Sequence, residues 1–291
     1  LVPIQITLLR AARSLLRITP GAFVEFGQMV WVVILVLAPL CLLAGLLFTL
    51  GTRLITEQGE STAKAYIWES TGAVAGGALF SFLFIRWFDP YQSALLVTAI
   101  NLTSVVILLS PQRWYSLMLL VLLGAVALPF GHSLHEATLR LQWQDLVFSA
   151  DSPYGRLTIQ ARDSQRIFFE NGLLAFETQG TFPEEIVHFP LLEHPNPQHV
   201  LLIGGGVAGD LGEILKHPVS SASYVELDPL LIEGARNYLP PDEAAILNDP
   251  RLTLIFSDGR RYVKQNAPNR LRFDVIILDL PDPSTGALNR F

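Results

Sequence analysis

The sequence predicts a multi-span α-helical membrane region followed by a Rossmann-like α/β domain, with a small antiparallel β meander at the start of that domain. Of the 291 residues, 51% are hydrophobic and only 16% are charged, and the mean hydropathy is +0.40. These values lie outside the usual balance for a soluble protein. The apolar excess ends near Leu141, and after it apolar strands alternate with helices behind a glycine-rich loop.

Residues 1–141 form the predicted membrane region. Four stretches come close to the roughly 20 apolar residues that a spanning helix needs, and Trp or Tyr residues lie near their ends, as at membrane interfaces. The stretches are residues 29–50, 66–88, 91–109 and 114–130. We therefore expect an integral membrane protein of a bacterial-type inner or cell membrane, with the lipid bilayer as a partner.

Basic residues give the expected orientation. Arg10, Arg13 and Arg17 precede the first span and favour a cytoplasmic start. Because four crossings return the chain to the same side, we expect the second domain to be cytoplasmic.

Charge and cysteine content exclude several classes of function. From Asp145 onward the chain has 20 acidic and 12 basic residues, which argues against a nucleic-acid partner. Cys41 is the single cysteine, so neither a disulfide framework nor a thiolate metal site is available. We expect no bound metal.

The second domain begins with a β-rich subdomain at residues 145–182. Between Tyr154 and Thr178, short β-prone runs are separated by turn signals at Arg162-Asp163-Ser164 and at Asn171-Gly172. This pattern is typical of an antiparallel meander.

Residues 183–291 form the predicted Rossmann-like part, which we expect to continue beyond the end of this sequence. Apolar strands alternate there with helices predicted at residues 209–217, 229–238 and 260–265. Continuous apolar strands separated by helices indicate a parallel sheet covered on both faces. Such sheets bind their ligands at the carboxyl ends of the strands.

Glycines and carboxylates occupy those strand ends. The glycines remove side chains so that a cofactor can lie against the backbone. Glu226 is placed to accept hydrogen bonds from ribose hydroxyls, Asp258 from an exocyclic amine, and two further carboxylates could hold an ammonium group and take its proton. The candidates are Gly204, Gly205, Gly206 and Gly209; Glu226; Asp258 and Gly259; and Asp279 and Asp282.

The glycine loop alone does not identify its ligand. Gly204-x-Gly206-x-x-Gly209 alone would fit NAD binding, methyl transfer or a structural turn, and an Asp at a strand end is often only a helix N-cap. However, Asp210 and Glu213 follow the loop, which contains no Arg or Lys. Acid beside the loop disfavours a pyrophosphate and fits a sulfonium such as S-adenosylmethionine or its decarboxylated form.

From about Asp151 to the end, the sequence resembles the spermidine synthase family of polyamine aminopropyltransferases. The resemblance rests on "DSPYGRLTI", "HVLLIGGGVAGDLGEILKH", "YVELDP", "DPRLTLIFSDGRRYV" and "FDVIILDLPDP", in the order of the family's motifs. Joined to the apolar region, the chain resembles the membrane-fused spermidine synthase-like proteins. This resemblance implies a fold of the class I methyltransferase type.

The resemblance also implies roles for individual residues. Glu226 would bind the ribose of decarboxylated S-adenosylmethionine, and Asp258 its adenine. Asp279 would deprotonate the attacking amine, and Asp282 would help to hold an amine. Tyr154 and Glu185 stand at positions of substrate-side motifs. A polyamine or another small amine would be the substrate, and a homodimer is retained as a candidate assembly.

The sequence departs from the family at three positions. Val207 replaces the loop acid that meets the donor's amino group, Gly155 replaces a Gln, and a Tyr-His-Glu stretch keeps only Glu185. Asp210 is a candidate substitute for the missing loop acid. Methyl transfer from S-adenosylmethionine and a transport or sensor protein with a nucleoside-binding domain therefore stand as alternatives to aminopropyl transfer.

Overall fold

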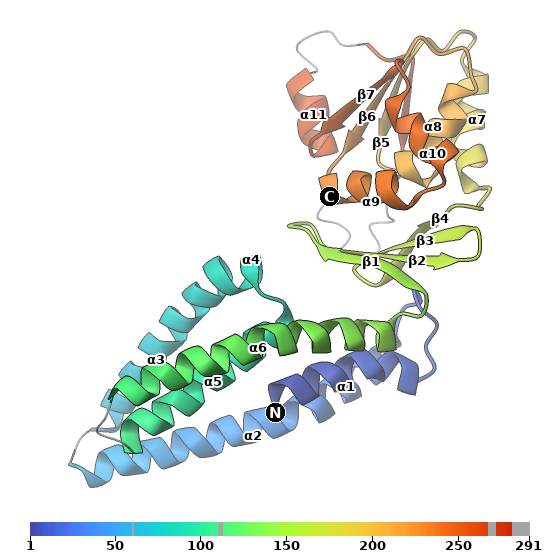
Figure 1. Ribbon diagram of the computed structural model, residues 1–291. Coiled ribbons are helices and arrows are strands. Elements are labelled where there is room, and N and C mark those ends of the chain that lie inside the picture. Colours follow the sequence, from blue (N-terminus) through green and yellow to red (C-terminus); the bar gives the residue numbers. More distant parts are fainter. Residues whose placement is uncertain (60, 110–112, 267–271, 281–291) are drawn as a thin grey trace. The chain divides into compact units, whose positions relative to one another are not determined.

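The computed structural model describes residues 1–59, 61–109, 113–266 and 272–280 (Figure 1). The chain divides into two compact units. One comprises Leu1–Thr19 and Phe23–Gln144, and the other comprises Pro20–Ala22 and Asp145–Phe291.

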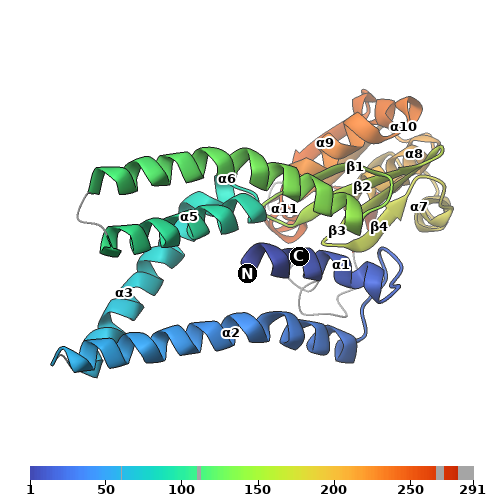
Figure 2. The same cartoon turned by 60° about the horizontal axis from the view of Figure 1, so that its bottom comes forward.

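All regular secondary structure in the described residues of the first unit is helical. Its helices α5 and α6 lie side by side along their length, and α1 also packs on α6 (Figures 1 and 2). The elements are α1 (Val2–Leu15), α2 (Phe26–Glu57), α3 (Thr62–Leu79), the π-helical turn η1 (Phe80–Phe84), α4 (Ile85–Trp87), α5 (Pro90–Leu109) and α6 (Arg113–Gln142).

Four helical segments are long and apolar enough to cross a membrane: Phe26–Glu57, Thr62–Trp87, Pro90–Ile107 and Met118–Gln142. The four apolar helices predicted from the sequence are therefore confirmed as helices. The last helix, α6, continues 12 residues beyond the spanning stretch that ends at Phe130 and stops next to the predicted end of the membrane region at residue 141. Thr138 and Leu139 in this last part are buried.

A buried arginine joins α1 to α6. Arg10 is only 7% exposed, and its guanidinium donates to the carbonyl oxygen of His135 at 2.9 Å and to Thr138 Oγ1 at 2.6 Å. It also lies over the ring of Tyr91 in α5. Buried charges need such partners, and these contacts tie three helices together.

The second unit begins with the predicted meander. Strands β1 (Leu146–Asp151), β2 (Arg156–Arg162), β3 (Gln165–Glu170) and β4 (Leu173–Glu177) pair antiparallel in the order β1-β2-β3-β4. Both predicted turns are confirmed, and Asn171 and Gly172 adopt positive φ angles, as a two-residue hairpin turn requires. The first strand lies before the segment that the turn signals marked.

A parallel sheet follows the meander, in the order β7-β6-β5-β8. Its predicted helices are present, with ends that differ by one or two residues. The elements are α7 (Phe182–Glu193), β5 (His199–Ile203), the 3-10 turn η2 (Gly206–Ala208), α8 (Asp210–Leu215), β6 (Ser221–Glu226), α9 (Pro229–Tyr238), α10 (Pro241–Ala245), the 3-10 turn η3 (Ile246–Asn248), β7 (Leu252–Phe256), α11 (Gly259–Asn266) and β8 (Val275–Leu278).

Strand β5 shows why its sequence is continuously apolar. Val200 and Leu202 belong to the core cluster that α7, α8 and α9 cover, whereas Leu201 and Ile203 belong to a second cluster with Tyr262 of α11. Alternate side chains thus face opposite layers, and both layers are dry. The meander packs on the first cluster through Leu157, Ile159 and Phe168, which makes it part of the same unit.

Candidate active site

The strand order arranges the predicted site residues along one edge of the parallel sheet. Asp258 follows β7, Glu226 ends β6, the glycine loop follows β5, and Asp279 follows β8. Because neighbouring strands are about 4.8 Å apart, the ends of β7 and β8 are separated by roughly 14 Å. The edge therefore presents three carboxylates with a loop lacking side chains between the second and third.

The glycine loop lies close to its neighbours on two sides. Gly205 has a φ of +65°, and a Cβ built on it would collide with the carboxylates of Asp279 and Asp210. A Cβ on Gly206 would lie 2.5 Å from Cζ of Tyr224. Since Gly204 also adopts a positive φ, the loop passes between these groups only as glycine.

The other two glycines position helices. Gly209 precedes α8, where a Cβ would lie 2.9 Å from Cγ of Pro183 at the start of α7. Gly259 begins α11, where a Cβ would lie 2.5 Å from Cγ2 of Ile203. Both glycines bring a helix N-terminus close to the sheet.

Glu226 is buried and held in place by three donors. Its Oε1 accepts from the backbone N–H groups of Leu227 at 2.8 Å and Asp228 at 3.0 Å, and its Oε2 accepts from the Tyr224 hydroxyl at 2.6 Å. Burial raises the pKa of Glu226, against the lowering effect of these donors. A carboxylate has about four acceptor sites, so one site on Oε2 is left for a ligand.

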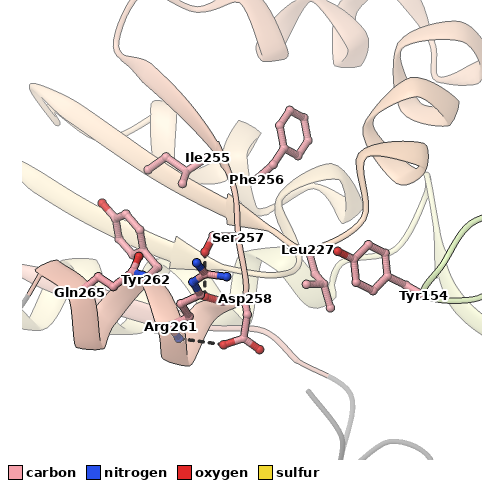
Figure 3. Close-up of a pocket in the computed structure, with 9 residues that line it drawn as sticks. All are labelled: Tyr154, Leu227, Ile255, Phe256, Ser257, Asp258, Arg261, Tyr262 and Gln265. Carbon is pink, nitrogen blue, oxygen red and sulfur yellow. Dashed lines mark hydrogen bonds between the residues drawn. The ribbon is translucent and has the colours of Figure 1, made fainter.

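A cavity of about 720 Å³ lies beside Asp258 (Figure 3). Tyr154 and Leu227 stand together on one side of it, and Tyr262 and Gln265 stand on the other (Figure 3). Its lining residues are Tyr154, Leu227, Ile255, Phe256, Ser257, Asp258, Arg261, Tyr262 and Gln265. A polar carboxylate between aromatic and aliphatic walls is an arrangement that can hold a flat, hydrogen-bonding ring.

Asp258 has two roles in this geometry. Its Oδ1 accepts from the backbone N–H of Arg261 at 2.8 Å and so caps α11, as an aspartate before a helix commonly does. The N-cap interpretation is therefore correct for Asp258, but the side chain also lines the cavity. Capping uses Oδ1, so Oδ2 remains available to a ligand.

Two polar contacts place the loop that carries Tyr154. Ser152 donates to Asp228 Oδ2 at 2.5 Å, which fixes the meander to the end of β6. A Cβ on Gly155 would lie 2.5 Å from the side-chain amide of Asn171, whose Oδ1 accepts from the backbone N–H of Arg156. A side chain at residue 155 would therefore displace the Asn171 amide from this contact.

Asp279 and Asp210 meet at the other end of the edge. Asp279 extends the pairing of β8, since its backbone N–H donates to the carbonyl of Ile203 at 3.0 Å. Burial raises the pKa of Asp279. Asp210 is fully buried; burial first, and then the charge of Asp279, raise the pKa of Asp210 to about 8.

Several residues of the site were not predicted from the sequence. Leu227, Phe256 and Tyr262 line the cavity because of the way β6, β7 and α11 meet. Glu170 ends β3 with an exposed side chain, and its pKa is raised, first by partial loss of water and then by the charges of Glu226 and Asp228. It lies on the meander, so the pattern of the parallel sheet could not reveal it.

The remaining predicted residues are not brought into this cavity. Glu185 is exposed in the first turn of α7 and is not among the lining residues. Asp282 lies outside the described residues. Across the described ranges, no group of three His, Cys, Asp or Glu residues could hold a metal ion.

Residues 181–291 match the family model described as the spermine/spermidine synthase domain. Over these residues the chain is similar to the spermine and spermidine synthases. It is 26% identical to a polyamine aminopropyltransferase of Corynebacterium efficiens over 291 residues, an alignment that covers 92% of this chain and 56% of the relative. It is 36% identical to a polyamine aminopropyltransferase of Caldicellulosiruptor bescii over 155 residues, covering 53% of this chain and 51% of the relative.

The chain spans about half the length of these two curated relatives. Among solved structures, it is 35% identical to a spermidine synthase from Thermotoga maritima, with a TM-score of 0.42 and coverage of 46% of this chain and 47% of the other. A second solved spermidine synthase, in complex with the transition-state analogue AdoDATO, gives 35% identity, a TM-score of 0.43 and the same coverage.

Proposed function

We propose that this protein is a membrane-anchored aminopropyltransferase that moves an aminopropyl group from decarboxylated S-adenosylmethionine to a polyamine. The order of polar groups along the sheet edge is the observation that supports this most strongly. Asp258, Glu226, the glycine loop and Asp279 follow one another as the adenine, ribose, sulfonium and attacking amine do in the reacting pair.

The cavity beside Asp258 would hold the adenine. Its walls of Tyr154, Leu227 and Tyr262 offer apolar surface to the ring, and Asp258 Oδ2 can accept from the exocyclic N6–H. Glu226 would take a ribose hydroxyl at the acceptor site left on Oε2. This geometry would lay the adenosyl group across β7 and β6, with the sulfonium over the glycine loop.

The carboxylates suit a cationic donor. Glu226 and Asp279 flank the loop, and a cation between two acidic groups is stabilised in a site from which water is partly excluded. In the proposed reaction, a neutral amine nitrogen attacks the carbon next to the sulfonium. The carbon–sulfur bond breaks with its electron pair on sulfur, and methylthioadenosine leaves.

Asp279 would be the general base of this step. A polyamine nitrogen is mostly an ammonium in water and has no lone pair until it loses a proton. Because burial raises the pKa of Asp279, its carboxylate accepts a proton more readily than an exposed aspartate does. Asp282 is proposed to help hold an amine, and Tyr154 and Glu185 to contact substrate.

The helical unit is proposed to anchor the enzyme in a bilayer. Four helices of the required length and apolarity support this. With Arg10, Arg13 and Arg17 before the first span, the catalytic unit would lie on the cytoplasmic side.

Methyl transfer from S-adenosylmethionine is the second candidate, because of Val207. Its side chain is 7% exposed and belongs to the apolar core cluster. The loop position that would meet the donor's amino group therefore offers no acid. This observation bears on the choice between the two donors and not on the location of the site.

Calorimetric titration of the full-length protein in detergent with decarboxylated S-adenosylmethionine, S-adenosylmethionine and NAD tests the proposal. We expect the decarboxylated donor to bind most tightly and to release methylthioadenosine when a polyamine is added. Preference for intact S-adenosylmethionine would favour methyl transfer. Binding of none of the three would contradict both enzymatic proposals and favour a function of the helical unit.

The variant Asp279→Asn separates binding from chemistry. We expect it to form no methylthioadenosine and still to bind the donor, with an affinity lowered only by the loss of one of the two carboxylates that face the sulfonium. Asp163→Asn is a matched control, because Asp163 lies in the exposed turn between β2 and β3, where asparagine accepts the same positive φ. Unchanged turnover of Asp279→Asn would rule out the role proposed for this carboxylate.

A further inference from the structure

Asp210 is a buried carboxyl group that the proposed reaction does not use. It is the first residue of α8 and has 0% exposure. Within the part of the chain that the structure describes, no N–H or O–H donor reaches either of its carboxyl oxygens. An unpartnered carboxylate is costly in such a position, so its surroundings need an explanation.

The neighbour that explains it is Asp279. A Cβ built on Gly205 would collide with Oδ2 of both Asp210 and Asp279. The two carboxyl groups therefore converge on the same point of the glycine loop, one from the start of α8 and one from the end of β8. This convergence is possible only because residue 205 has no side chain.

Two ionised carboxylates cannot hydrogen-bond to each other, because both only accept. At close range they repel, and one of them retains a proton. We propose that Asp210 is a positioning residue that stays protonated and donates a hydrogen bond to Asp279, which orients the general base and keeps it ionised. The role of Asp279 as the base rests on the proposed function, but the inference that Asp210 is protonated does not.

The electrostatics of the pair agree with this assignment of the proton. Burial is the largest cause that raises the pKa of Asp210 to about 8, followed by the charge of Asp279, a hydrogen bond shared with Asp279 and the charge of Glu213. The same hydrogen bond lowers the pKa of Asp279. The more deeply buried partner thus holds the proton, and the partner at the edge remains the base.

The other charged groups near α8 are engaged elsewhere. Glu213, one turn along the helix, pairs with Lys216 and with His188 of α7. His188 in turn contacts His217, beyond the end of α8. None of these groups offers Asp210 a cation, so a shared proton is the available way to relieve its contact with Asp279.

Burial also separates this role from the one suggested by sequence alone. A substitute for the missing loop acid would have to touch the donor's amino group, whereas Asp210 has no exposed surface. It can reach the reacting atoms only through Asp279. Asp210 is therefore assigned to the support of the base and not to the binding of the donor.

Infrared difference spectroscopy on the full-length protein, with ¹³C-labelled aspartate, tests for the proton directly. We expect a protonated-carboxyl band at neutral pH that disappears in Asp210→Asn, persists in the Asp163→Asn control and titrates with a midpoint near the pKa of about 8. A spectrum without this band, or one unchanged in Asp210→Asn, would overturn the inference. The band does not depend on turnover, so its presence without aminopropyl transfer would contradict the proposed function alone.

Kinetics test the positioning role. The amide of Asp210→Asn would keep a donor that cannot ionise. For this variant we expect a near-wild-type kcat at neutral pH. At pH values above about 8, where wild-type Asp210 loses its proton, we expect the kcat of the variant to increase relative to that of wild type. Asp210→Leu has no donor, and we expect kcat to fall about 10-fold to 100-fold with an unchanged KM for the donor. Equal activity of the Asn and Leu variants at every pH would contradict the role.

Discussion

The hydroxyl of Tyr224 donates a hydrogen bond of 2.6 Å to Oε2 of Glu226, two residues further along β6. Residues separated by two positions share one face of a strand. The ring of Tyr224 is completely buried under Gly206, whereas Glu226 ends the strand at the proposed ribose position. One side chain therefore connects the apolar core, the glycine loop and the ligand-binding edge.

Replacement of Tyr224 by phenylalanine should weaken donor binding with little loss of packing. The variant removes one donor from a buried carboxylate, so we expect a cost of about 1.5 kcal/mol, or roughly 10-fold in Kd. Calorimetry with decarboxylated S-adenosylmethionine measures it. Tyr238→Phe is the control, since that ring packs on Phe148 instead; equal affinities of the two variants would argue against the connection.

Substitutions of Asp258 should separate its role in ligand binding from its role in helix capping. Asparagine also caps helices well, so Asp258→Asn should leave α11 intact while it replaces the acceptor offered to adenine. We expect a donor affinity about 10-fold lower and an unchanged Tm. Asp258→Ala should lose both functions and about 1 kcal/mol of stability. If the Asn variant bound the donor normally, Asp258 would be only a cap.

Gly205→Ala should abolish turnover and lower stability. Its Cβ would collide with Asp210 and Asp279, and its φ of +65° is unfavourable for alanine. Gly212→Ala in α8 is a matched control, because its Cβ would meet only the end of the Ile246 side chain, at 3.1 Å. Turnover and thermal unfolding distinguish them, and equal behaviour of the two variants would contradict the close approach at residue 205.

The pH dependence of stability should change in Asp210→Asn. The pKa of this group rises from 3.8 in the unfolded chain to about 8 in the folded protein. Between these values the folded state binds a proton that the unfolded state has released, so wild-type stability falls as pH increases. We expect the stability of the variant relative to wild type to increase across this range, by on the order of a few kcal/mol in the free energy of unfolding. A difference in Tm between the variant and wild type that stays the same at every pH would count against the raised pKa of Asp210.

Cys41 offers a test of membrane insertion, since it is the single cysteine and lies exposed near the middle of α2. If α2 spans a bilayer, the thiol lies in hydrocarbon, where the reactive thiolate does not form. We expect no maleimide labelling in membranes and rapid labelling after unfolding in detergent. A second cysteine introduced by Thr62→Cys, at the start of α3, should react in both states. Labelling of Cys41 in intact membranes would refute the span.

Local patterns predicted the elements well where one physical signal dominates. Apolar length identified the four long helices, and Asn171-Gly172 marked a hairpin because few other pairs accept two positive φ angles. The apolar stretch 114–130 ends 12 residues before α6 does, and the burial of Thr138 and Leu139 in that last part is a tertiary effect. Pro20–Ala22 join the second unit through the pairing of Gly21 with Leu173, which no local pattern announces.

The sequence by itself determined the two-part organisation, the glycine loop and the acidic strand ends, because hydrophobic periodicity and residue type are local properties. Only the tertiary structure decided the order of those ends across the sheet, the double use of Asp258 and the meeting of Asp210 with Asp279. These depend on strand order and on the direction of side chains at helix starts. Both are set by long-range packing of the two apolar layers, whose contacts join residues far apart in the chain.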